Sequence, residues 1–294
     1  MLLAATVFSA CENLDSGLGI TGQGPMIEEI HHLDEFQNIE VDVNARVYLT
    51  QDEARPILIR GQANILNNLT VKAPHGTLRI NYLEKVRTHD MLEIHLSLPT
   101  LVNLSTTRSA CIQSMKAFGS ERFVFQVYGS GKINMEIEHA QNINTRINGL
   151  GEISLKGNTE TLDVVINGSG SVLAPELKSH ESTIQLTGSG FCKVCGNNSL
   201  DVNINGAGKV FYAGTPVSLQ TRISSNGELH QVLQVRAGYL IFCSRLRPDN
   251  YQDSVWDFAS LKMLSPIHFV SSGRNRFAQD AVIQYFGRAI VKIP

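Results

Sequence analysis

The stretch VVINGSGSVLAPEL, Val164–Leu177, places two glycines one residue apart between runs of β-branched and aliphatic residues. The same arrangement recurs nearby, in VYGSGKINM (127–135), INGLGEISL (147–155), INGSGSVLA (166–174), LTGSGFCKV (186–194) and INGAGKVFY (204–212). The first glycines of these copies are 18–20 residues apart, a period typical of a solenoid or a similar array. The repeat therefore predicts an all-β fold, a β-solenoid with coils of about 19 residues and Gly-x-Gly corners.

The residues around each glycine pair predict which side chains face the core. When the first glycine is numbered zero, positions −2, +4 and +6 are apolar and alternate with polar positions, as in a half-buried strand. Position −2 holds Val127, Ile147, Ile166, Leu186 and Ile204; position +4 holds Ile133, Ile153, Val172, Cys192 and Val210; position +6 holds Met135, Leu155, Ala174, Val194 and Tyr212. Since burying one such side chain contributes about 1.5–3 kcal/mol, several stacked coils can offset the ordering entropy that one coil cannot. Degenerate copies at RSACI (108–112) and SNGEL (225–229) suit the two ends of such a stack.

The paired glycines could in principle bind a phosphate group, but the sequence favours a structural role. A phosphate-binding loop needs a lysine and a following helix, and it occurs once rather than in every coil. We expect a corner at which neighbouring backbones lie close or φ is positive, with Asn148, Asn167 and Asn205 stacked along the axis just before it. The predicted corner residues are Gly129, Gly131, Gly149, Gly151, Gly168, Gly170, Gly188, Gly190, Gly206 and Gly208.

The rest of the chain differs from the repeats in pattern. Residues 34–104 alternate apolar and polar residues without the glycine pairs and predict an N-terminal β region ahead of the repeat solenoid at 105–235. Residues 236–294 lose the periodicity, gain arginine and contain the chain's single tryptophan. We expect this tail to be a fused extra unit or a read-through or frameshift product, packed weakly against the solenoid.

The N-terminal segment MLLAATVFSAC (1–11) is an apolar run that ends in small residues and a cysteine. It resembles the lipobox of bacterial lipoproteins, which would make Cys11 an acylated lipid anchor, with 12–33 as a polar tether and a first strand. No basic residue precedes the run and a signal segment is normally about 15–30 residues long, so we expect the natural start to lie upstream. The alternative is a buried apolar N-terminus with an ordinary cysteine.

Composition excludes some classes of function. A formal net charge of −2 gives no electrostatic basis for binding nucleic acid. No segment approaches the roughly 18 consecutive apolar residues of a membrane-spanning helix.

The glycine repeats, together with ITGQG (20–24) and DEFQNIEVDVNARVYLTQ (34–51), resemble the family named "putative auto-transporter adhesin, head GIN domain" over residues 19–232. The resemblance implies a right-handed β-helical fold and an envelope lipoprotein or secreted protein of a Gram-negative bacterium. Its name implies adhesion, and no catalytic residue comes with it.

Several residue groups could carry chemistry, and each has a simpler structural explanation. Cys192 and Cys195 form a CxxC, but Cys192 falls in the inward +4 column and Cys195 should face outward, and no further zinc ligands lie nearby. In an oxidising envelope Cys111, Cys192, Cys195 and Cys243 could form disulfides, whose pairing the sequence leaves open.

Acidic residues and histidines also suggest possible binding or catalytic sites, but the sequence favours a simpler explanation for each group. His31, His32, Asp34 and Glu35 could bind a metal, yet they lie where a polar segment enters the first long strand and suit a solvated face better. Glu136, Glu138, Glu152 and Asp163 could serve a β-helical polysaccharide enzyme, but they share no single column. The apolar +4 column also lacks the aspartates of calcium-binding nonapeptide repeats.

These observations lead to three hypotheses of function. The first is a non-enzymatic lipoprotein adhesin on the bacterial cell envelope, at the outer membrane, with no metal or cofactor and with a glycan or protein ligand on a cell or matrix surface. The second is a periplasm-facing structural or sensory lipoprotein with a protein partner. The third is a β-helical carbohydrate-active enzyme.

Overall fold

The computed structural model describes residues 19–232, 243–245, 283–285 and 289–291, and Cys11 lies outside this range. The structure is nearly all β and forms a β-solenoid of about six turns. The N-terminal elements are β1 (Ile20–Thr21), β2 (Met26–His31), β3 (Asn38–Asp42), β4 (Arg46–Gln51), β5 (Ile57–Gln62), α1 (Ala63–Leu66), β6 (Leu69–Lys72), a 3-10 turn (Pro74–Gly76), β7 (Thr77–Tyr82), β8 (Val86–Thr88), β9 (Glu93–Leu98), β10 (Asn103–Thr106) and β11 (Cys111–Ser114). The repeats and the tail contribute β12 (Phe118–Gly129), β13 (Lys132–Gly149), β14 (Glu152–Gly168), β15 (Ser171–Gly188), β16 (Phe191–Gly206), β17 (Lys209–Ala213), β18 (Ser218–Ser224), β19 (Glu228–Val232), β20 (Cys243–Arg245), β21 (Ile283–Tyr285) and β22 (Ala289–Val291).

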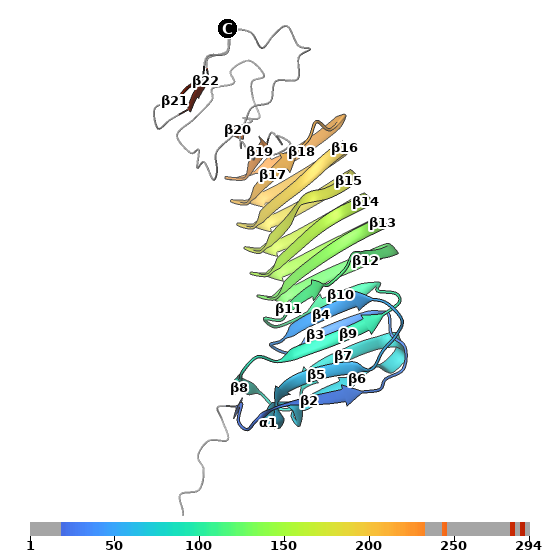
Figure 1. Ribbon diagram of the computed structural model, residues 1–294. Helices are drawn as coiled ribbons and strands as arrows, with labels where there is room; N and C mark the ends of the chain where they lie inside the picture. The colour runs from blue at the N-terminus through green and yellow to red at the C-terminus, as the bar shows by residue number, and fades with distance from the viewer. Residues whose placement is uncertain (1–18, 233–242, 246–282, 286–288, 292–294) are drawn as a thin grey trace, which may run out of the picture.

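The long strands β12 to β16 stack as parallel neighbours, each one coil of the solenoid (Figure 1). Their first glycines align across the stack, in the order Gly129, Gly149, Gly168, Gly188 and Gly206. The residues expected in the inward columns are buried, with exposed fractions of 0–3%. The apolar columns of the repeat thus form one continuous core.

The N-terminal strands join this stack in an order that differs from their order in the sequence. The coil made by β3 and β4 lies between the coil of β7 and β9 on one side and that of β10 and β11 on the other, all in parallel. Antiparallel strands then close the N-terminal end, since β5 pairs with β2 and β9 and β6 pairs with β7. Antiparallel capping shields the edges that a bare parallel stack would expose.

The two glycines of each corner meet different requirements. The first glycine has a positive φ, from 115° at Gly188 to 139° at Gly129, a conformation that side chains disfavour. The second glycine lies under a side chain of the preceding coil: a Cβ at Gly170 would lie 2.5 Å from Cγ2 of Ile147. In the degenerate SNGEL copy, Ser225 holds the first-glycine position with a smaller positive φ of 62°. Gly227 keeps the second position, where a Cβ would lie 2.6 Å from Cγ2 of Ile204.

The C-terminal coil splits into two strands with different neighbours. β18 pairs with β16, whereas β19 pairs with β17 in parallel and with β20 in antiparallel. Most of the 236–294 tail, for which weak packing is expected, lies outside the described residues.

Candidate binding surface

The most regular polar surface of the solenoid lies on the strand segments that precede the glycine corners. We call it the amide face and define it by three outward columns at positions −1, −3 and −5. The columns contain Tyr128, Asn148, Asn167, Thr187, Asn205 and Ser224; Gln126, Arg146, Val165, Gln185, Asn203 and Arg222; and Val124, Asn144, Asp163, Thr183, Asp201 and Gln220. All of these side chains are half-buried or exposed. Amide and hydroxyl groups dominate the face, and its two arginines and two aspartates balance in charge.

Neighbouring coils hold the amide face together through side-chain hydrogen bonds. The Asn167 Nδ2 group donates to Asn148 Oδ1 at 2.9 Å, and the Ser224 hydroxyl donates to Asn205 Oδ1 at 3.2 Å. Two asparagines are thus bonded along the axis at one step, and a serine and an asparagine at another.

A shallow hollow of about 260 Å³ opens on the amide face near its C-terminal end. Gln185, Thr187, Asn203, Asn205 and Ser224 line it, above the buried Leu186. Since adjacent parallel strands lie about 4.8 Å apart, donors and acceptors recur here at a fixed spacing. The hollow can therefore accept a flat ligand rich in hydroxyl groups.

The sheet face after the glycine corner is different, because charged side chains pair there between coils. Lys132 lies 3.6 Å from Glu152, and Glu136 lies 3.0 Å from Lys156. Asp163, by contrast, lies on the amide face. Glu138 lies on β13 and is exposed. Two of the four carboxylates singled out in the sequence thus pair with lysines, and Asp163 lies on another face of the solenoid.

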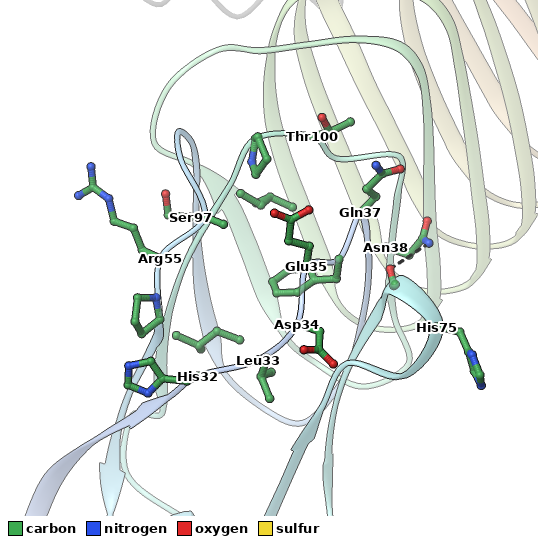
Figure 2. A pocket seen from close by; sticks show the side chains of 17 residues that line it. His32, Leu33, Asp34, Glu35, Gln37, Asn38, Arg55, His75, Ser97 and Thr100 are labelled. Atoms are coloured by element: carbon green, nitrogen blue, oxygen red, sulfur yellow. Dashed lines mark hydrogen bonds between the residues drawn. The ribbon is translucent and has the colours of Figure 1, made fainter.

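A second hollow, of about 480 Å³, lies beside the N-terminal coils (Figure 2). His32, Asp34 and Glu35 line it from the segment between β2 and β3, and Arg55 and His75 come from other turns. Figure 2 shows Asp34 and Glu35 in the middle of the hollow, with the rings of His32 and His75 on opposite sides. Backbone contacts fix the rim: the amide of Gln37 donates to the carbonyl of Gly76 at 3.1 Å.

The structure separates the two adjacent histidines. His31 belongs to β2 and lies 3.4 Å from Glu29, while His32 lines the hollow. Within the described part of the chain, no three His, Cys, Asp or Glu side chains gather closely enough to hold a metal ion. His32, Asp34 and Glu35 are exposed, as on a solvated face.

The cysteines of the CxxC are both buried, so the expectation that Cys195 faces outward is wrong. β15 pairs Ala174 with Val194 and then Lys178 with Cys195, so the register skips three residues of β15 at this bend. At the same bend Val194, Cys195 and Gly196 of β16 are buried in succession, so the alternation of inward and outward side chains on which the expectation relied breaks there. Burial raises the pKa of the Cys192 thiol. Burial also raises the pKa of the Cys195 thiol, and the positive charge of Lys178 acts in the opposite direction. Cys111, Cys192 and Cys195 are free thiols.

Sequence reasoning singled out one of the three amide-face columns, through Asn148, Asn167 and Asn205. It missed the columns at −3 and −5, although their polar residues alternate with the apolar ones at a period of two. It also missed Arg55, His75 and Ser97 of the second hollow, because they come together from the loop before β5, the 3-10 turn and β9. No local sequence pattern marks such a meeting.

The geometry defines a class of protein, a β-solenoid with a filled core and a repetitive polar surface. The chain belongs to the family described as "putative auto-transporter adhesin, head GIN domain", whose model matches residues 35–216, well over half of the chain. No curated protein matches the chain.

Solved structures share the fold. A protein of Bacteroides fragilis named a putative adhesin matches with a TM-score of 0.67 and 20% identity, over 73% of this chain and 100% of its own. A Parabacteroides distasonis protein named a putative lipid binding protein matches with a TM-score of 0.60 and 20% identity, over 72% and 99%. A putative adhesin of Parabacteroides merdae matches with a TM-score of 0.58 and 19% identity, over 73% and 99%. In the described residues, no helix has the length and apolar character needed to cross a membrane.

Proposed function

We propose that this protein is a non-enzymatic adhesin of a bacterial cell envelope, held at the outer membrane by an acylated Cys11, and that its amide face binds glycans. The carrying observation is the amide face itself, in which three columns of amide and hydroxyl groups repeat from coil to coil around a shallow hollow. Such groups both donate and accept hydrogen bonds, which suits sugar hydroxyls. A repeating surface also suits a repeating polymer, since several weak contacts add up through multivalency.

Two observations favour binding over catalysis. The carboxylates that could have formed an acid pair are bonded to lysines of neighbouring coils or lie on different faces. The side chains of the amide face are mostly amides and hydroxyls, which suit hydrogen bonding to a ligand better than the transfer of protons in general acid–base catalysis.

The lipid ligand suggested by the name of the Parabacteroides distasonis relative fits this chain less well. Polar side chains supply nearly all of the lining of the hollow on the amide face, and the N-terminal hollow mixes charged side chains with apolar ones. The solenoid interior is filled by its apolar columns. A lipid tail needs an apolar cavity instead.

Glycan binding can be tested with the purified full chain on an array of polysaccharides. Asn203→Ala combined with Asn205→Ala removes two amides from the hollow and should weaken binding. Asn134→Ala is the matched control, because it removes the same kind of side chain from the face after the corner. Equal binding by all three proteins, or no binding to any glycan, would contradict the proposal.

Location and anchoring need a separate test in cells. Protease treatment of intact cells should remove the protein if the solenoid faces outward, and Cys11→Ser should release it from the membrane fraction. Protection until the cells are permeabilised would instead support a periplasm-facing lipoprotein with a protein partner.

A further inference from the structure

The last long strand of the solenoid has a neighbour on one side. β18 pairs with β16 in parallel, from Ser199 opposite Ser218 to Asn205 opposite Ser224. Within the described part of the chain no strand pairs with its other edge, whereas β20 covers the edge of β19 in the same coil. An uncovered strand edge offers a row of backbone donors and acceptors to a further strand.

The core is also open at this edge. Leu219 and Ile223 continue the inward columns of Leu200 and Ile204, but they are 38% and 37% exposed, where Leu200 and Ile204 are fully buried. Thr221 lies between them and is exposed as well. Half-covered core side chains beside a free edge indicate that one more strand would complete the packing.

The sequence of β18, Ser-Leu-Gln-Thr-Arg-Ile-Ser, reads nearly the same in both directions about Thr221. We propose that β18 pairs in antiparallel with β18 of a second copy, centred on Thr221, to form a two-fold dimer of solenoids. In this register each Ser218 faces Ser224 of the other copy, each Leu219 faces Ile223, and each Gln220 faces Arg222. Apolar residues meet apolar ones on the core side and polar residues meet polar ones outside.

The dimer closes on itself, because a two-fold contact uses the same edge in both copies. In the dimer, Leu219, Thr221 and Ile223 of one copy pack against the same residues of the other. The exposed end of each core is covered in this way. β18 lies at the opposite end of the stack from β1 and β2 (Figure 1). The two N-terminal ends would therefore point away from each other, and if the chain is anchored as proposed above, the pair could link two membranes.

The partner residues allow a charge test that separates dimerisation from folding. Gln220 lies beside Asp201 of the neighbouring coil in its own copy, and Arg222 lies 3.7 Å from that same carboxylate. Gln220→Lys thus places a cation next to Asp201 within one copy but opposite Arg222 in the dimer. Sedimentation of the full chain at increasing concentration should show a monomer–dimer equilibrium, and Gln220→Lys should weaken it about fivefold, because the like-charge pair occurs twice by symmetry. Its melting temperature at low concentration should not fall.

A cysteine scan tests the register. Thr221→Cys should form a disulfide-linked dimer on oxidation, because each Thr221 faces its counterpart. Ser218→Cys should not, because two Ser218 residues lie at opposite ends of the paired strands. Oxidation of the unsubstituted chain shows how much disulfide-linked dimer forms through its natural cysteines. A chain that stays monomeric at every concentration, or crosslinking through Ser218→Cys instead, would overturn the proposal. Neither readout depends on glycan binding, so the two proposals can fail separately.

Discussion

Gly168 lies against the backbone of Gly149 in the preceding coil. A Cβ built on Gly168 would be 2.7 Å from the Gly149 carbonyl oxygen, and the φ of Gly168 is 125°. Backbone atoms of a stacked coil cannot move aside as a flexible side chain can. The corner therefore demands glycine for two reasons at once, a contact and a conformation.

Gly168→Ala should lower the free energy of unfolding by more than about 1 kcal/mol, since the left-handed conformation alone costs a side chain about 1–2 kcal/mol. Chemical denaturation measures the change. Gly119→Ala in β12 is the matched control, because its Cβ would approach nothing closer than 3.9 Å. Equal stability of the two variants would show that the corner does not restrict its residue.

Ser225 occupies the first-glycine position of the terminal coil and has a φ of 62°. Ser225→Gly should therefore raise stability, by about 0.5–1 kcal/mol after the entropy that glycine adds to the unfolded chain is subtracted. Ser218→Gly on the same edge strand lacks this strain and should lower stability instead. Thermal unfolding of the two variants and the natural chain measures both changes in stability. A loss of stability in Ser225→Gly would contradict the strain argument.

The fold could be predicted from the sequence where the repeat is regular. The inward columns follow from counting two residues at a time from each glycine, since strands alternate their faces. The same counting failed at Cys195, because the alternation of β16 breaks at this bend, where Val194, Cys195 and Gly196 are buried in succession. It could not have found the insertion of the β3–β4 coil between later coils either, because strand order depends on long-range pairing rather than on local pattern.

The candidate surface was predictable only in part, for a related reason. The Asn148, Asn167 and Asn205 column stands out because one residue type recurs beside a glycine. The column of Gln126, Arg146 and Gln185 varies in residue type, and its common feature is its position on the face. Residues can be assigned to this position only when the register between neighbouring coils is known.

Stability should fall in acid partly through Glu228. Its hydrogen bond from His230, at 2.9 Å, is the largest cause that lowers the carboxyl pKa below the usual 4.5, and Lys209 at 3.2 Å adds to it. The folded state then binds fewer protons than the unfolded state, so this contribution is present above about pH 4.5 and is lost as pH falls through the lower folded pKa. Glu228→Gln should flatten the pH dependence of unfolding in this range, measured by denaturant titration. If the free energy of unfolding varied with pH equally in the natural chain and in Glu228→Gln, the contribution of Glu228 would be refuted.

Stability should also fall in strong base through Tyr82. Burial is the largest cause that raises the pKa of its hydroxyl from 10.0 to about 12, against the opposing effect of Arg108, and the hydroxyl lies 2.8 Å from His89 Nε2. Between these two pH values the folded state keeps a proton that the unfolded state has lost, so stability decreases as pH rises through this window. Denaturation curves across the window should show this loss in the natural chain and a smaller one in Tyr82→Phe. The difference in ultraviolet phenolate absorbance between the two proteins should show a midpoint near pH 12 while the chain stays folded. A midpoint near pH 10 would show that Tyr82 is open to solvent.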